Sequence, residues 1–199
     1  LRRVTIRDGA SGIGEGAFAD CAALESVSFP ETVESFIISS SAFARCGALT
    51  SVTIPEGVTH IWISAFADCA ALERVTLPDS VEELGDYVFS NCGALTSVTI
   101  PDGVKAIPDY AFSGCGSLAS AVLGSAVERI GRNAFSGCKS LTKLVIPNSV
   151  TRIGAHAFSG CVALSSVTLG NALKTIGSDA FSGCSSLTGI LIPDRSEER

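Results

Sequence analysis

Apolar and polar residues alternate in short runs that recur along the whole chain. In Leu95-Thr96-Ser97-Val98-Thr99-Ile100 every polar residue lies beside an apolar one, the pattern of a strand with one buried face. Pro101 follows and removes a backbone donor, and Asp102-Gly103 is typical of a turn. The pattern therefore predicts a short strand that ends at a tight turn.

A second segment completes the same stretch of chain. Val104 to Ile107 carries two more apolar residues that we expect to point inward. Ala111-Phe112-Ser113-Gly114-Cys115 then resembles one helical turn closed by a glycine in the left-handed conformation. One short strand and one turn bury too little surface alone, so each unit has to stack on its neighbours.

The cysteines give the period of these units. Eight cysteines are spaced 23 residues apart, except for one gap of 25, and each has a phenylalanine three residues earlier. The unit of 25 residues also has Arg45 where the others have Asp, Asn or Gly, which predicts a distorted turn there. Full units begin at Leu1, Leu24, Leu49, Leu72, Leu95, Leu118, Leu141 and Leu164, and a partial unit covers 187–199.

These observations predict a repeat solenoid that forms one domain over residues 1–199. Parallel strands from successive units would form a β-sheet on one face, with short second strands and single helical turns elsewhere. The unit reads L-x-x-V-x-I-P-x-x-V-x-x-I-G-x-x-A-F-x-x-C-x-x, and Leu141 to Ala163 shows it nearly complete.

This unit resembles the BspA-like class of leucine-rich repeat, a 23-residue type, and the resemblance covers essentially the whole chain. It implies a right-handed superhelix and a cell-surface or secreted protein. Members with an assigned role act in adhesion to host proteins, aggregation between cells or attachment, and the class supplies no catalytic residues. The resemblance therefore implies a host or cell-surface protein as the partner.

Charge narrows the choice of partner. The net charge is −6 and the basic residues are scattered along the sequence, which argues against a nucleic acid partner. No apolar run approaches the ~20 residues of a membrane span, so we expect no membrane insertion.

The residues that could carry chemistry favour structural roles. All eight cysteines share one position of the unit, which predicts reduced, buried thiols; disulfides between neighbours are the alternative. His60 and His156 lie four units apart, and no catalytic or metal motif is present. Asp or Glu follows the first strand of five units, but turn chemistry explains this better than calcium does. We expect no enzyme activity, no metal and no cofactor.

The outward positions of the first strands form one candidate binding surface. Most are Ser or Thr, which are also common at exposed strand positions that have no binding role. A carbohydrate or ice surface is a weaker alternative, because valines interrupt the hydroxyl array. The candidates on this sheet face are Arg3, Ser51, Thr53, Arg74, Thr76, Ser97, Thr99 and Lys143.

A second candidate surface comes from units two to five, where large apolar residues replace small or polar ones. Because adjacent units are neighbours in space, these residues predict one exposed apolar patch that binds a protein. In the alternative, the insertion of unit two folds over and Phe36, Ile37 and Trp62 cover one another. The residues of the predicted patch are Phe36, Ile37, Ile38, Trp62, Ile63, Tyr87 and Tyr110.

The sequence thus predicts a protein-binding module without catalysis. The alternative is a scaffold, natural or engineered, that self-associates as a homodimer through the same apolar patch. The first unit also lacks a polar cap, which suggests a fragment or an edge covered by a partner.

Overall fold

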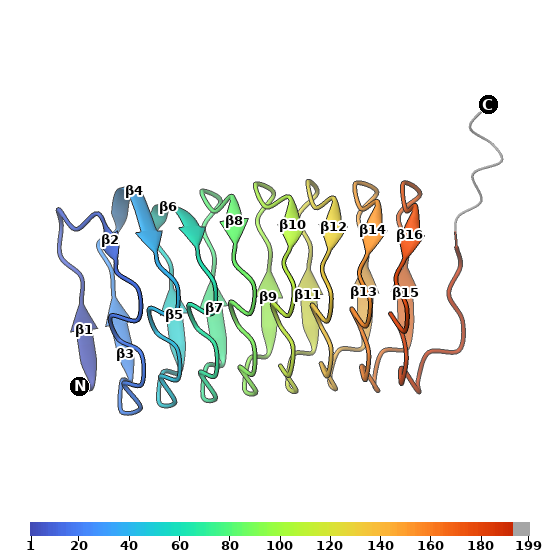
Figure 1. Ribbon diagram of the computed structural model, residues 1–199, viewed down its shortest axis with the longest axis horizontal. Coiled ribbons are helices and arrows are strands. Elements are labelled where there is room, and N and C mark those ends of the chain that lie inside the picture. Colours follow the sequence, from blue (N-terminus) through green and yellow to red (C-terminus); the bar gives the residue numbers. More distant parts are fainter. Residues whose placement is uncertain (193–199) are drawn as a thin grey trace.

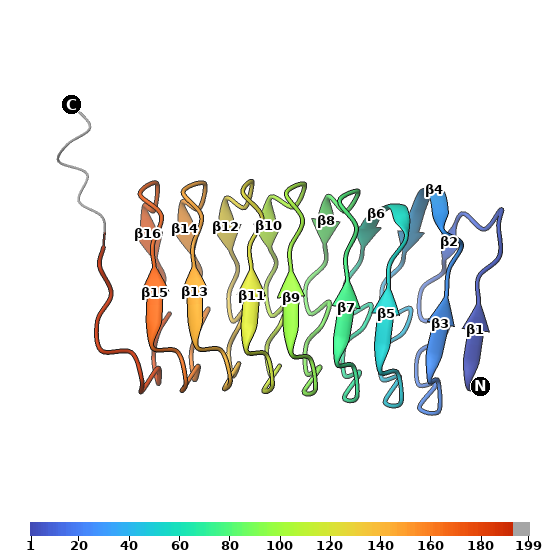
Figure 2. The same cartoon turned by 180° about the vertical axis from the view of Figure 1, so that it is seen from behind.

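The computed structural model describes residues 1–192 of the chain. Sixteen short strands, β1 to β16, follow one another in this part of the chain, and it contains no helix. Each unit contributes two strands, which run on opposite sides of the stack (Figures 1 and 2). The predicted parallel-strand solenoid is therefore confirmed.

The first strands of the units form the first ladder, which consists of three sheets, with no strand pairing between units two and three or between units six and seven. Its strands pair in parallel with the register of the repeat, as between Arg3 and Ser26 or between Lys143 and Ser166. In most of these strands the middle residue is buried and both flanking residues are exposed, as the alternating pattern predicts. The members are β1 (Arg3–Thr5), β3 (Ser26–Ser28), β5 (Ser51–Thr53), β7 (Arg74–Thr76), β9 (Ser97–Thr99), β11 (Ser120–Val122), β13 (Lys143–Val145) and β15 (Ser166–Thr168).

The second strands form the second ladder, which lies nearer to the viewer in Figure 1. An apolar residue of each strand except β16 points into the core, such as Ile107 or Ile130, both nearly inaccessible. The members are β2 (Gly12–Ile13), β4 (Thr32–Ile38), β6 (Glu56–Ile61), β8 (Glu83–Leu84), β10 (Ala106–Ile107), β12 (Arg129–Ile130), β14 (Arg152–Ile153) and β16 (Thr175–Ile176).

A proline divides the second ladder in two. One sheet runs from β2 to β8 and another from β10 to β16, with no strand pairing between β8 and β10. After the strand, Gly85, Gly131 and Gly154 each donate an N–H to a carbonyl of the preceding unit. Pro108 occupies the same position in unit five and has no N–H to donate. The break therefore falls where the missing donor is.

The predicted helical turns are wrong in form. The segment that ends at each cysteine is an irregular turn whose amides bond the neighbouring unit; the Phe112 N–H, for example, donates to the Ala134 carbonyl at 2.8 Å. The next unit presents a carbonyl to every second amide, and the amides between them bond within the turn, as from the Ser113 N–H to the Tyr110 carbonyl at 3.2 Å. The left-handed closing residue is confirmed, with φ of 76° at Gly114 and 60° at Arg45.

Arg45 causes no distorted turn, contrary to the prediction. Its backbone matches that of the other units, and its guanidinium makes two hydrogen bonds to the Asp20 carboxylate of the preceding unit, with Nη2 2.7 Å from Oδ2. This contact lowers the pKa of Asp20. The irregularity lies instead in β4, whose register with β6 shifts on both sides of Phe36. The longer unit is thus accommodated by a bulged strand.

The core is a continuous column of stacked side chains. Phenylalanine rings from adjacent units lie parallel, with centroids 5.2 Å apart for Phe43 and Phe66 and 5.4 Å for Phe135 and Phe158. The cysteines are free, and all except Cys21 are buried. The Cys115 thiol donates to the Phe89 carbonyl at 3.2 Å, and burial raises its pKa to about 12. Reduced, buried thiols are therefore confirmed for seven positions.

Residues 193–199 lie outside the described part of the chain, so the extension of the domain to them stays a prediction.

Candidate interaction surfaces

The sheet face of the first ladder is exposed, as expected. Val122 and Val145, which lie on neighbouring strands, add apolar surface there, with exposed fractions of 55% and 66%. The hydroxyl positions on either side leave the rest of this face polar. All the sheet-face candidates named from the sequence are exposed: Arg3, Ser51, Thr53, Arg74, Thr76, Ser97, Thr99 and Lys143.

The predicted apolar patch is wrong at two residues. Phe36 and Ile38 are fully buried and belong to the core, so neither is available to a partner. The bulge in β4 turns both side chains inward, and the Phe36 ring meets the Phe29 ring edge-on at 6.1 Å. Phe36 is therefore buried in the continuous core of the solenoid, and not in the separate cluster with Ile37 and Trp62 that the alternative predicted.

The other members of the patch reach the surface. Ile37, Ile63 and Tyr87 have exposed fractions of 37%, 49% and 41%. Trp62 is half-buried, with its ring 5.3 Å from that of His60, and Tyr110 is half-buried as well. These five residues come from four successive units, and we call them the reduced patch.

Tyr87 and Tyr110 form the most ordered part of this patch. Their rings stack with centroids 4.6 Å apart and planes inclined by 6°. Both residues have left-handed backbone, with φ of 59° and 58°, which is unfavourable for a bulky side chain. We call these two residues the tyrosine pair.

The other units show why the backbone is left-handed at this position. Each amide here donates to the next unit, as from Tyr87 N–H to the Asp109 carbonyl at 3.0 Å and from Tyr110 N–H to the Arg132 carbonyl at 2.8 Å. The stacking register thus imposes the conformation on whichever residue is present. A signal existed in the sequence, because the other units have Gly16, Ser41, Ser64, Asn133, His156 and Asp179 at this position, mostly residues that tolerate positive φ.

Charge is strongly polarised along the solenoid, and the prediction of scattered basic residues is wrong. Units one to four, residues 1–94, contain 13 acidic and 5 basic residues, for a net charge of −8. Units five to eight, residues 95–186, contain 4 acidic and 7 basic residues, for a net charge of +3. Units five to eight are therefore basic although the net charge of the whole chain is −6.

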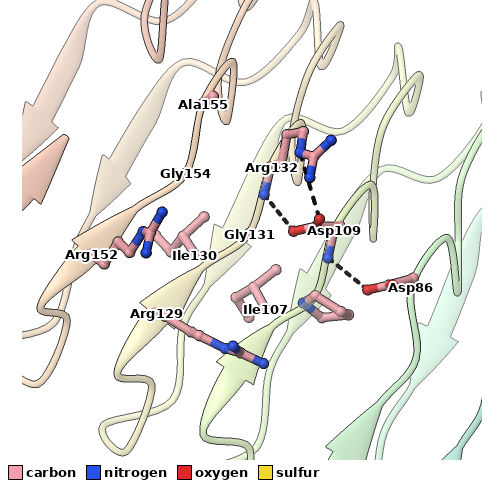
Figure 3. A pocket seen from close by; sticks show the side chains of 11 residues that line it. Asp86, Ile107, Asp109, Arg129, Ile130, Gly131, Arg132, Arg152, Gly154 and Ala155 are labelled. Atoms are coloured by element: carbon pink, nitrogen blue, oxygen red, sulfur yellow. Dashed lines mark hydrogen bonds and ion pairs between the residues drawn. The ribbon is translucent and has the colours of Figure 1, made fainter. Parts of the chain in front are cut away.

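The basic half contains a groove beside the second ladder. It has a volume of about 430 Å³. Arg129 and Arg152 are directly paired in the register of β12 and β14, and within residues 1–192 neither makes an ion pair (Figure 3). Arg132 completes the basic lining, and we call this hollow the arginine groove. The groove is not apparent from the sequence, because its three arginines are separated by up to 23 residues and meet only through stacking of the units.

Asp86 and Asp109 lie at one end of the groove, at equivalent positions of successive units (Figure 3). Asp86 Oδ1 accepts the N–H of Asp109 at 3.0 Å, and Asp109 Oδ1 accepts the N–H of Arg132 at 2.7 Å. The Arg132 Nε also lies 3.8 Å from Asp109 Oδ2. Each aspartate thus satisfies an amide of the next unit that no other group in residues 1–192 satisfies.

Two further properties of residues 1–192 bear on function. No group of three or more His, Cys, Asp or Glu side chains in this range is placed to hold a metal ion. No helix long and apolar enough to cross a membrane occurs in the same range. One of the acidic turn positions bonds the neighbouring turn: Asp102 Oδ1 accepts the Ser125 N–H at 2.6 Å, which lowers the pKa of Asp102.

Comparison with known families matches this architecture. The profile of the BspA type leucine rich repeat region, which spans 6 copies, matches residues 1–119, 36–146 and 105–198. The chain belongs to this family. Curated proteins gave no match.

Solved structures of other leucine-rich repeat proteins are similar to this member of the family. A leucine-rich repeat protein from Bacteroides ovatus is 30% identical, with a TM-score of 0.57, over 99% of this chain and 62% of its own. The T. pallidum leucine rich repeat protein is 28% identical, with a TM-score of 0.64, over 93% of this chain and 77% of its own. The pneumococcal vaccine antigen PcpA, 23% identical with a TM-score of 0.61 over 100% of this chain and 58% of its own, shares the fold. This chain thus spans about 62% of the length of the Bacteroides ovatus protein.

Proposed function

We propose that this BspA-type solenoid is a non-catalytic protein-binding module, presented at the cell surface or secreted, whose partner is a host or cell-surface protein. Membership in the BspA-type family supports the class of function. The contact surface we assign is the reduced patch, Ile37, Trp62, Ile63, Tyr87 and Tyr110, centred on the tyrosine pair.

The backbone of the tyrosine pair is the observation that carries this proposal. A bulky residue in the left-handed region costs about 1 kcal/mol or more relative to glycine or asparagine. Tyr87 and Tyr110 both bear this cost, although Asn133 shows that a better-suited residue fits the same position. Folding stability alone does not favour tyrosine here, whereas binding does, since tyrosine is enriched among the residues that dominate interface energies.

The geometry of the pair suits a protein contact. The two stacked rings form a rigid apolar platform with hydroxyl groups at its edge, and Tyr87 is 41% exposed. The rings are held by backbone bonds to the next unit, so binding would order few additional groups. Ile63, 49% exposed in the adjacent unit, extends the apolar surface.

The double variant Tyr87→Asn/Tyr110→Asn tests the proposal. The immobilised chain would be assayed against purified extracellular matrix proteins and intact epithelial cells. We expect the variant to bind at least tenfold more weakly than the wild-type chain, since two anchors are lost. Its free energy of unfolding should stay within about 1 kcal/mol of the wild-type value. Asparagine bears less backbone strain than tyrosine in the left-handed conformation, and this gain offsets the lost ring stacking.

Thr76→Asn/Thr99→Asn is the matched control. It changes two residues of adjacent units on the sheet face and leaves the tyrosine pair intact. Unchanged binding by the control, together with weak binding by the tyrosine variant, supports the reduced patch. The reverse result would move the binding site to the sheet face, and equal binding by all three chains would contradict both surfaces.

A homodimer through the reduced patch is the second candidate, favoured by the exposure of Ile63 and Ile37 at its edge. The test is the solution mass of the chain across a wide range of concentrations, with Trp62→Ser as the comparison. A dimer that this substitution separates into folded monomers would establish self-association. A monomer at every concentration would reject it.

A further inference from the structure

The contact between Asp109 and Arg132 shows how this scaffold holds a carboxylate. Asp109 Oδ1 accepts the Arg132 N–H at 2.7 Å, and a Cβ placed on Gly131 would lie 2.6 Å from the same oxygen. The carboxylate reaches the amide only because glycine leaves that space open. The Arg132 guanidinium approaches the second oxygen. An amide, a glycine floor and a guanidinium together form the binding arrangement.

One unit further along, the glycine and the amide recur, whereas the carboxylate and the guanidinium do not. Gly154 repeats Gly131 and Ala155 repeats Arg132, but the residue that would supply the acceptor is now Arg132 instead of an aspartate. The Ala155 N–H accordingly has no acceptor within residues 1–192. Gly154, Ala155 and Arg132 all line the arginine groove.

The charges around this open amide are positive. Arg129 and Arg152 lie on adjacent strands about 4.8 Å apart, line the same groove and have no carboxylate partner in residues 1–192. Like charges paired directly across strands repel one another. An anion between them would relieve this repulsion and accept forked guanidinium hydrogen bonds.

We propose that the arginine groove is a carboxylate-binding site, which takes an Asp or Glu side chain from an acidic segment of a partner protein over Gly154. One carboxylate oxygen accepts the Ala155 N–H, as Asp109 does one unit earlier, and Arg129 and Arg152 bind the remaining lone pairs. The inference deepens the proposed protein-binding function, and it rests on residues outside the reduced patch.

The carboxylate is the anion that the structure supports best. The scaffold already binds two planar carboxylates at equivalent positions, through Asp86 and Asp109. Asp109 keeps the acidic end of the groove negative, which favours a ligand with single, spaced negative charges over a densely charged polyanion. Such a ligand is an acidic peptide segment.

A short acidic peptide provides the direct test. An eight-residue peptide of alternating Asp and Gly, carrying a fluorophore, would be titrated with the full chain at 50 mM salt and followed by anisotropy. We expect saturable binding that weakens at 300 mM salt and disappears when Asn replaces Asp in the peptide. Arg129→Gln/Arg152→Gln should weaken binding at least tenfold. Lys139→Gln/Lys143→Gln removes the same charge from exposed positions outside the groove lining, and its binding should stay within twofold of wild type.

Two substitutions of equal charge separate the amide from the arginines. Arg132→Asn introduces an acceptor that can take the Ala155 N–H, as Asn148 Oδ1 takes the N–H of Asn171 in another turn. Arg132→Ala introduces none. If the amide belongs to the site, the asparagine variant binds the peptide at least fivefold more weakly than the alanine variant. Equal affinity of these two variants overturns the role of Ala155.

Other outcomes overturn the proposal as a whole. Equal weakening by the groove and control double variants would mean general attraction to the basic half. Binding of a sulfated polysaccharide but not of the peptide would assign the groove to a different ligand. The tyrosine variants of the proposed function leave the groove intact, so peptide binding that persists while matrix-protein binding is lost distinguishes the two hypotheses.

Discussion

At the residue scale, stacking between units fixes the backbone conformation of a repeat position, whichever side chain is present there. Arg45, Asp20 and Gly114 share the left-handed closing position, although only glycine is free of strain there. Arg45 is compensated by its contact with Asp20. The tyrosine pair has only ring stacking as compensation, and this difference makes its position informative about function.

The buried thiols predict a loss of stability at alkaline pH. Burial raises the pKa of Cys69 and Cys115 to about 12, above the ordinary value of 9.0. Between these values the unfolded chain loses a proton that the folded chain retains. The stabilising contribution is therefore complete below pH 9 and falls by about 1.4 kcal/mol per pH unit and thiol above it.

The variant Cys115→Ala isolates one such thiol. In urea unfolding with reductant present, we expect it to be less stable than wild type at pH 7.5 and to close that gap by about 1.4 kcal/mol per unit between pH 9 and 10.5. Tyrosine and lysine titration cancels in the comparison. A gap that stays constant over this range would show that Cys115 titrates alike in the folded and unfolded states.

At the element scale, the strands and turns are short because neighbours supply their hydrogen bonds. Within residues 1–192 no strand exceeds the 7 residues of β4, and most have two or three. Pro108 interrupts the second ladder without breaking the stack, since the core on both sides of it is continuous. Side-chain stacking therefore holds the two parts of the ladder together.

The phenylalanine column predicts a gradient of mutational cost. Phe112 is fully buried between the rings of Phe89 and Phe135, whereas Phe181 stacks on one ring and is partly exposed. Phe112→Ala should lower the free energy of unfolding by about 3–5 kcal/mol, and Phe181→Ala by less than half as much. Urea denaturation of both variants measures the difference, and equal losses would contradict the gradient.

At the scale of the whole molecule, two properties emerge that no single unit possesses. The acidic half and the basic half arise because units of one fold carry different surface residues. The arginine groove arises because strands β12 and β14 bring residues 23 positions apart side by side. Both bear on partner choice, and neither alters the core.

Stacking also predicts where the molecule opens first. Each unit contacts only its neighbours, so an end unit is held on one side and a central unit on both. We expect backbone amides of β16, which pairs only with β14 within residues 1–192, to exchange with deuterium at least tenfold faster than those of β12, which pairs with a strand on each side. Hydrogen exchange followed by mass spectrometry resolves these segments. Uniform protection along the chain would instead indicate all-or-none opening.

Much of this protein followed from its sequence, because the repeat leaves little freedom. The period of the cysteines and phenylalanines determined the units, and the alternation of residues such as Leu95 to Ile100 determined the inward and outward faces of the first strands. Eight copies of one pattern agree with one another, so local preference and global fold coincide.

The tertiary structure alone decided what happens where the units differ. Whether Phe36 and Ile38 face the core depended on the bulge in β4, which is set by its pairing with β6. The turns before each cysteine are not helical because every second amide donates to the neighbouring unit. The strain at Tyr87 and Tyr110 and the open amide of Ala155 likewise depend on contacts between units. A sequence pattern reports what one unit prefers, whereas these features result from the interaction of one unit with the next.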